Sequence, residues 1–241
     1  MITTIHFYDE CSEQYAELTA KADMSKQYAK FMAYLPSGAG ILDVSSAAKQ
    51  NVASGQVKIL DAGCGSGRDS LYFMKKGYAV TMLDASAGMC KCAEKLTGRK
   101  ALCMKFDEIE FADQFDGIWA CASLLHVPEK ELEAVFVKFW RALKDNGILY
   151  ASWKYGEEER YDGERFYCDM TEEKLKNVLA RVKMAKRLQD ANLFSETHGC
   201  ESDANLFECV DCWVVEDALP LGREQKWLNV ILGKSTKEKL R

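Results

Sequence analysis

The sequence lacks the features of several protein classes. Its 241 residues include only 3 prolines, too few for a collagen-like or proline-rich linker sequence. No apolar run approaches the roughly 18 residues of a membrane span. Basic residues are not in excess, with 32 against 37 acidic ones, so a broad basic surface for nucleic acid is not expected. We therefore expect neither a membrane nor a nucleic-acid partner.

A secretion signal and a disulfide framework are also missing. The first residues include His6, Asp9 and Glu10, where a signal peptide needs an unbroken apolar core. The 10 cysteines make up about 4% of the chain, below the roughly 8–10% that is typical of short disulfide scaffolds. These observations predict a cytoplasmic protein with reduced thiols.

Two pairs of possible zinc ligands stand near the end of the chain. His198 and Cys200 form H-x-C, and Cys209 and Cys212 form C-x-x-C. However, the last two fall in a predicted strand, where residues three apart point to opposite faces. We therefore predict no metal site.

What is present is typical of a globular protein of one domain. Hydrophobic residues make up 48% of the chain and the net charge is −5. Two imperfect internal repeats, in which 37–43 resembles 54–61 and 190–194 recurs as 203–207, mark candidate surface inserts. We predict a single domain over 1–241, with a helical cap at 1–36, a core at 57–234, and inserts near 44–57 and 190–206.

Hydrophobic periodicity predicts an α/β fold. A helical pattern over Ser12–Tyr34 is followed by strands that alternate with helices, which is typical of a parallel sheet with right-handed crossovers. No helical pattern separates the last two strands, so they are expected to form an antiparallel hairpin at the sheet edge. The predicted strands are Val57–Leu60, Tyr78–Leu83, Ala101–Lys105, Asp116–Cys121, Ile148–Trp153, Leu206–Val215 and Trp227–Leu232. The predicted helices after the first are Asp69–Lys76, Met89–Leu96, Glu131–Leu143 and Thr171–Ala180.

A glycine-rich loop follows the first of these strands. Gly63, Gly65 and Gly67 stand where the strand must turn sharply into a helix, and glycine allows both a positive φ and a close approach of the backbone to a ligand. A dinucleotide site needs G-x-G-x-x-G, and here the third glycine comes one residue early. Asp61 at the strand end suits an ammonium group better than a pyrophosphate. The alternative is a glycine turn without a ligand.

Carboxylates also follow the next two strands. Asp84 lies 17 residues after Gly67, close to the spacing of about 20 at which a carboxylate accepts the hydroxyls of a ribose. Its alternative role is to cap the next helix. Phe106 and Asp107 follow the third strand, where an aromatic ring can cover an adenine and a carboxylate can accept its amino group. All three carboxylates belong to one crevice at the ends of the strands.

Several runs resemble a known family. ILDAGCGSGRDS, MLDAS, KFDEIEF, FDGIWACASLLHVP and GILYASWKYGE resemble class I S-adenosylmethionine-dependent methyltransferases, and more narrowly are similar to the bacterial small-molecule methyltransferases of the tellurite-resistance type. The resemblance covers Phe7–Tyr34, Lys58–Ala180 and Phe207–Lys234. It implies a Rossmann-like, seven-stranded mixed sheet with helices on both faces, an antiparallel hairpin of the last two strands, and an N-terminal helical cap. It also implies in-line methyl transfer from S-adenosylmethionine to a small molecule, with S-adenosylhomocysteine as product.

The resemblance assigns roles to the residues of the crevice. Asp61 would face the methionine ammonium, the glycines would let the backbone approach the cofactor, Asp84 would hold the ribose, and Asp107 would contact adenine. Cys121 would lie under the sulfonium. The predicted cofactor-binding residues are Asp61, Gly63, Cys64, Gly65, Gly67, Asp84, Ala85, Phe106, Asp107 and Cys121.

Two residues are candidates for a catalytic role. His126 follows the fourth strand, where acceptor-side residues fall in such enzymes, and is a candidate base or orienting group. Tyr15, with Tyr8 and Tyr28, lies on the predicted cap and can close over the methyl group. The alternatives are a histidine that bonds a loop and tyrosines that pack a helix on the sheet.

Four basic residues can bind an anionic acceptor. These are Arg68, Lys154, Arg160 and Arg165, although solvated surface charges are the alternative for the last two.

Two other functions remain open at this point. One is a non-catalytic, regulatory module that binds S-adenosylmethionine, and the other is a nucleotide-dependent oxidoreductase, against which the early Gly67 argues. The acceptor atom and the oligomeric state are not predicted.

Overall fold

The structure, a computed structural model, describes residues 2–36, 55–193, 206–217 and 225–235; of Ile2 and of residues 185–193 it describes the backbone alone. Most of the two predicted inserts, near 44–57 and 190–206, lies outside this part of the chain.

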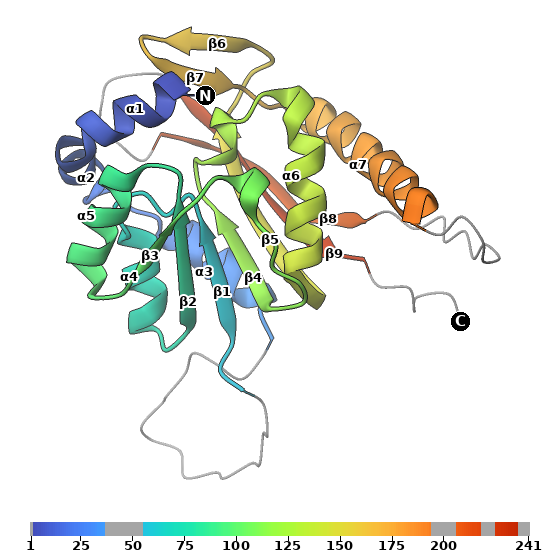
Figure 1. The fold of residues 1–241 in the computed structure, drawn as a ribbon, viewed down its shortest axis with the longest axis horizontal. Helices are drawn as coiled ribbons and strands as arrows, with labels where there is room; N and C mark the ends of the chain where they lie inside the picture. The colour runs from blue at the N-terminus through green and yellow to red at the C-terminus, as the bar shows by residue number, and fades with distance from the viewer. Residues whose placement is uncertain (1, 37–54, 194–205, 218–224, 236–241) are drawn as a thin grey trace.

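A seven-stranded mixed sheet forms the centre of the fold (Figure 1). The first five strands in chain order are parallel, and the last strand is antiparallel to both of its neighbours. The predicted mixed sheet with a final antiparallel hairpin is therefore confirmed. In spatial order the strands are β3 (Ala101–Cys103), β2 (Ala79–Asp84), β1 (Lys58–Ala62), β4 (Phe115–Ala120), β5 (Leu143–Lys154), β9 (Lys226–Lys234) and β8 (Phe207–Glu216).

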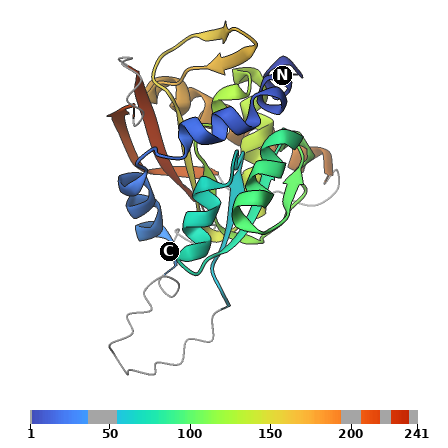
Figure 2. The ribbon, with the colours of Figure 1, turned by 90° about the vertical axis from the view of Figure 1, so that its left-hand side faces the viewer.

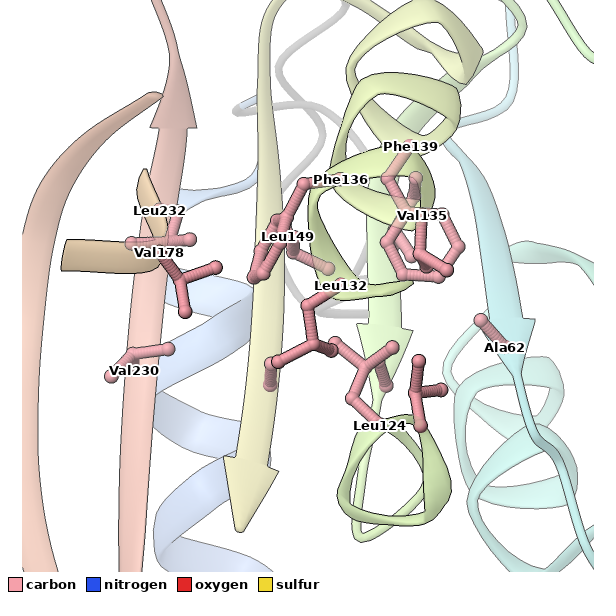
Figure 3. Packing of buried hydrophobic residues seen from close by; sticks show 14 of the residues in the cluster. Ala62, Leu124, Leu132, Val135, Phe136, Phe139, Leu149, Val178, Val230 and Leu232 are labelled. Atoms are coloured by element: carbon pink, nitrogen blue, oxygen red, sulfur yellow. The ribbon is translucent and has the colours of Figure 1, made fainter. Parts of the chain in front are cut away.

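Helices cover both faces of this sheet (Figures 1 and 2). One face packs against α6 (Glu129–Ala142) and α7 (Glu172–Leu193), and α6 directs Leu132, Phe136 and Phe139 into this core because they recur at steps of three and four residues (Figure 3). The opposite face packs against the helices α3 (Ser25–Tyr34), α4 (Arg68–Lys75) and α5 (Ala87–Thr97).

The N-terminal arm consists of three helices. The predicted helical pattern over Ser12–Tyr34 is divided into α2 (Ser12–Thr19) and α3, and α1 (Ile2–Glu10) precedes them. The interruption has a local cause, because the Asp23 carboxylate accepts the Ser25 N–H at 2.9 Å and competes with helical bonding.

Two short strands were not predicted. β6 (Glu159–Asp162) and β7 (Arg165–Cys168) form a separate hairpin, which lies near α1 at one end of the molecule (Figure 1). The turn begins at the sequence Asp-Gly, and Gly163 has a φ of 62°. Gly163 is the first of the two loop residues between the paired Asp162 and Arg165, and a glycine at that position is a known hairpin signal, so it was the available clue to the missed element.

The register of β8 contradicts the prediction that Cys209 and Cys212 point to opposite faces. The strand has a register shift between Cys209 and Asp211, so Cys209 pairs with Leu232 and Cys212 with Val230. Since these partners are two residues apart on β9, both thiols share one face, and the expectation of opposite faces was wrong. His198 and Cys200 lie outside the described residues. Within the described ranges, no group of three or more His, Cys, Asp and Glu residues is arranged to hold a metal ion.

Among the helices of the described residues, none combines the length and the apolarity that crossing a membrane requires.

Candidate functional site

A cavity of about 250 Å³ is lined by residues at the carboxyl ends of the parallel strands and by residues of α1 and α2. Its wall combines residues that the sequence analysis placed on separate strand ends and on the N-terminal arm. The predicted site residues that line it are Gly63, Cys64, Gly65, Asp84, Ala85, Phe106, Cys121, Tyr15 and His126.

Three predicted cofactor residues do not line this cavity. Asp61 is buried below the glycine loop, where it accepts the Ser70 hydroxyl at 2.5 Å, and burial and the neighbouring Asp69 raise its pKa. Gly67 packs α4 closely on α5, since a Cβ there would lie 3.0 Å from the Cα of Ala93. Asp107 is exposed on a short 3-10 helix.

The glycine loop is shaped by a close approach between β1 and β4. Gly63 has a φ of 81°, and a Cβ at this position would lie 2.4 Å from the Cβ of Ser123. Its N–H and that of Cys64 both donate to the Leu83 carbonyl at 2.9 Å. A side chain at Gly63 would therefore disturb both the turn and the cavity wall.

Asp84 is held by the backbone on both sides. Its Oδ2 accepts the Gly65 N–H and its Oδ1 accepts the Ser86 N–H, each at 2.9 Å. Burial raises the pKa of this carboxyl, while these N–H groups lower it. Because each carboxylate oxygen has a second lone pair, Asp84 can still accept two hydroxyl groups from the cavity. The alternative role as helix cap belongs to Ser86, whose Oγ accepts the Met89 N–H.

A further buried carboxylate was missed in the sequence. Asp69 lines the cavity and accepts hydrogen bonds from the Tyr28 hydroxyl at 2.5 Å, Trp119 Nε1 at 2.8 Å and Arg68 Nε at 2.6 Å. Burial opposes ionisation, but the guanidinium of Arg68 and these donors lower the pKa of Asp69. The available signal was an acidic residue in the first turn of the helix that follows the glycine loop.

Tyr28 packs α3 on α4. Its ring stacks on Tyr72 with centroids 3.9 Å apart, and its hydroxyl is used by Asp69. Tyr28 does not line the cavity. Tyr28 therefore has the alternative role considered in the sequence analysis, which is to pack a helix of the arm against the core.

The turn after β4 closes the floor of the cavity. Ala122 has a φ of 50°, which is unusual for a residue other than glycine and is typical of strained functional turns. Its N–H donates to Ser152 Oγ at 2.9 Å, which fixes the turn on β5. Burial raises the pKa of Cys121 to about 12, so this residue is a neutral thiol at pH 7.

Tyr8 connects the N-terminal arm to His126. The His126 Nδ1 lies 2.6 Å from the Phe166 carbonyl oxygen, which can only accept, so Nδ1 carries the ring proton. Nε2 then accepts the Tyr8 hydroxyl at 2.9 Å. Burial, Arg165 and Lys154 lower the pKa of His126 to about 4, although the Phe166 carbonyl acts in the opposite direction. His126 is thus neutral at pH 7.

Tyr15 lies beside this pair. Its ring meets that of Tyr8 edge to face, with centroids 5.0 Å apart. Burial raises the pKa of Tyr15, while the Tyr8 hydroxyl, Arg165 and Arg68 lower it. Both phenols therefore remain protonated at neutral pH and can act as hydrogen-bond donors.

Comparison with known proteins gives a family match for the central part of the chain. Residues 60–151 match the methyltransferase domain family. A protein of Geobacillus sp. (strain WCH70), provisionally named a methyltransferase, is 30% identical over 129 residues, which are 51% of this chain and 52% of that protein. The chain thus spans about half the length of this curated relative.

Solved structures show the same fold. The 1,6-didemethyltoxoflavin-N1-methyltransferase of Burkholderia thailandensis, solved with 1,6-didemethyltoxoflavin and S-adenosylhomocysteine, has a TM-score of 0.66 at 16% identity, and the alignment covers 98% of this chain and 88% of that one. An S-adenosylmethionine-dependent methyltransferase of Methanosarcina mazei has a TM-score of 0.56 at 22% identity over 74% and 92% of the two chains. The shared fold and the family match of residues 60–151 agree with the resemblance found in the sequence.

Proposed function

We propose that this protein transfers a methyl group from S-adenosylmethionine to a small-molecule acceptor. The observation that carries the proposal is the junction of Gly65 and Asp84 in the cavity wall. Gly65 has no side chain, so its backbone borders the cavity directly. The Asp84 carboxylate is held by two N–H groups and keeps lone pairs for a ribose. The match of residues 60–151 to the methyltransferase domain family supports the same function.

The residues present fit this cofactor along the cavity. Gly63 and Gly65 leave the room that side chains would fill, and Asp84 would hold the ribose. In this proposal Phe106 covers the adenine ring and Cys121 lies under the sulfonium; both residues line the cavity. We keep Asp61 in the proposal as an indirect partner of the methionine ammonium, since it lies below the loop and not in the wall.

When bound, S-adenosylmethionine supplies a methyl group on a positive sulfonium, which an acceptor lone pair takes as the carbon–sulfur bond breaks toward sulfur. Such a displacement depends mainly on alignment and on exclusion of water. Tyr8 and Tyr15, on the N-terminal arm, line the cavity and would cover the methyl group. Tyr8 donates its one proton to His126, so Tyr15 is the hydroxyl that can donate a hydrogen bond to an acceptor and orient its nucleophilic atom.

His126 acts in this proposal as an orienting group. Its Nε2 is already occupied by the Tyr8 hydroxyl, and its low pKa makes it a weak base. We therefore assign His126 to the positioning of Tyr8, and Tyr15 to contact with the acceptor.

We also propose three features of the protein for which the support comes from the sequence alone. They are the similarity to small-molecule methyltransferases of the tellurite-resistance type, a cytoplasmic location with reduced thiols, and the lack of a nucleic-acid partner.

Calorimetry with S-adenosylhomocysteine and with NADH tests the proposal. We expect binding of S-adenosylhomocysteine with one site per chain and none of NADH. Incubation with labelled S-adenosylmethionine and a mixture of small thiols, phenols and amines should then give labelled methyl product. Binding without transfer to any acceptor would favour a regulatory module, and preferential NADH binding would favour an oxidoreductase.

A further inference from the structure

We infer that the acceptor carries an oxyanion group, such as a carboxylate, which binds a basic cluster of Lys154, Arg160 and Arg165 beside the tyrosine end of the cavity. This inference rests on the proposed methyl transfer and extends it by naming the chemical class of the acceptor.

The β6–β7 hairpin builds most of this basic cluster. Its register pairs Arg160 with Tyr167 and Asp162 with Arg165. Directly paired residues, and residues two apart on one strand, share a face, so both arginines point to the same side as Tyr167. The Nζ of Lys154, at the end of β5, lies 3.6 Å from the ring centroid of Tyr167, and each guanidinium carbon lies 5.5 Å from it. Three cations thus surround one aromatic ring.

The carboxylates nearby do not balance this charge. Asp162 pairs with Arg165 at 3.6 Å, and Asp169 pairs with Arg160. Within the part of the chain that the structure describes, Lys154 has no ion pair. Burial first, and then the two arginines, lower the pKa of Lys154, while Asp162 and Asp169 act in the opposite direction without cancelling the effect, so part of the shift comes from repulsion among the three cations. A bound oxyanion would relieve that repulsion and accept charge-assisted hydrogen bonds.

The basic cluster adjoins the cavity through shared side chains. The ring of Tyr167 lies 5.0 Å from that of His126, which lines the cavity. Ser152, two residues before Lys154 on the same strand face, lines the cavity as well, and so does Trp227, the register partner of Lys154 on β9. An acceptor held at Tyr8 and Tyr15 can therefore extend an anionic group toward the cluster.

The acidic residues in the cavity wall lie elsewhere. Asp69 and Asp84 are at the cofactor end and already accept N–H or O–H donors. Glu216 ends β8 and Asp217 follows it, and β9 separates β8 from Lys154. The electrostatic preference beside Tyr167 is therefore for an anion.

Matched acids and amides test the inference. We would measure formation of S-adenosylhomocysteine with 2-mercaptobenzoate, 4-hydroxybenzoate and anthranilate, each beside the corresponding benzamide. We expect at least one acid to be methylated with a kcat/KM about tenfold or more above that of its amide, as for a charge-assisted contact. Lys154→Met and Arg165→Met should remove most of this preference and leave the affinity for S-adenosylhomocysteine unchanged.

Lys144→Met is the matched control, because Lys144 lies near the start of the same strand and pairs with Asp116. It should keep the preference for the acid. Equal use of acid and amide, use of the amides alone, or no methylation of any acid while S-adenosylhomocysteine still binds would overturn the inference. Absence of S-adenosylhomocysteine binding by the unmodified protein would instead contradict the proposed function.

Discussion

At the scale of single residues, the direction of a side chain decides its role more than its place in the sequence. Asp61 is the last but one residue of β1 and Asp84 is the last residue of β2, and only Asp84 lines the cavity. Asp61 points to the face that α4 covers and bonds Ser70. Since side chains alternate along a strand, a shift of one residue separates a ligand-facing carboxylate from a buried one.

Asp84→Ala should weaken binding of S-adenosylhomocysteine by roughly 10- to 100-fold, because it removes charge-assisted hydrogen bonds of about 1.5–3 kcal/mol in total. Asp84→Asn, which keeps one oxygen acceptor, should lose less. Calorimetry measures both. Asp107→Ala is the matched control, since Asp107 is exposed outside the cavity. A large loss in that variant would support the adenine contact predicted from sequence, and unchanged affinity in Asp84→Ala would refute the ribose assignment.

His126 should make the fold sensitive to acid. Its pKa of about 4 in the fold lies below the value of about 6.5 for an unfolded histidine, so the unfolded chain binds more protons between these values. The resulting stability is fully present above pH 6.5 and is lost as the pH falls toward 4. By this linkage the unmodified protein should lose about 2 kcal/mol more than His126→Gln between pH 7 and pH 5. Urea unfolding at both pH values tests this, and parallel losses in the two proteins would contradict the assigned burial effect.

At the scale of elements, strands with apolar runs were predicted within a few residues of their observed bounds. β1, β2 and β4 are buried in a parallel sheet, and their sequences show it. The β6–β7 hairpin was missed because its short strands are rich in charge, although the anion-binding inference depends on it. The bulge in β8 was also missed, since it exists only in the pairing with β9.

Asp9 attaches α1 to the start of α5. Asp9 accepts the Ser86 hydroxyl at 2.6 Å and the Gly88 N–H at 2.9 Å, directly beside the loop that holds Asp84. Asp9→Ala should release α1 and cost about 1–3 kcal/mol of local stability. Hydrogen exchange over residues 2–10 should accelerate, and S-adenosylhomocysteine should dissociate faster. Glu10→Ala, at an exposed neighbour, should change neither measurement, and an α1 equally protected in both variants would rule out this attachment.

At the scale of the whole molecule, the two faces of the sheet should unfold together. Phe31 on α3 packs on Trp119, and Phe139 on α6 belongs to the core that contains Trp153. Phe31→Ala and Phe139→Ala should each cost about 3–5 kcal/mol, because both rings are fully buried. If 1–241 is one domain, as the sequence predicts, each variant should show a single urea transition, at the same midpoint by tryptophan fluorescence and by circular dichroism. Leu18→Ala, at an exposed position on α2, is the control and should shift the midpoint little. Two separate transitions in Phe31→Ala would mean that the α3 face folds apart from the α6 face, and the single-domain prediction would be wrong.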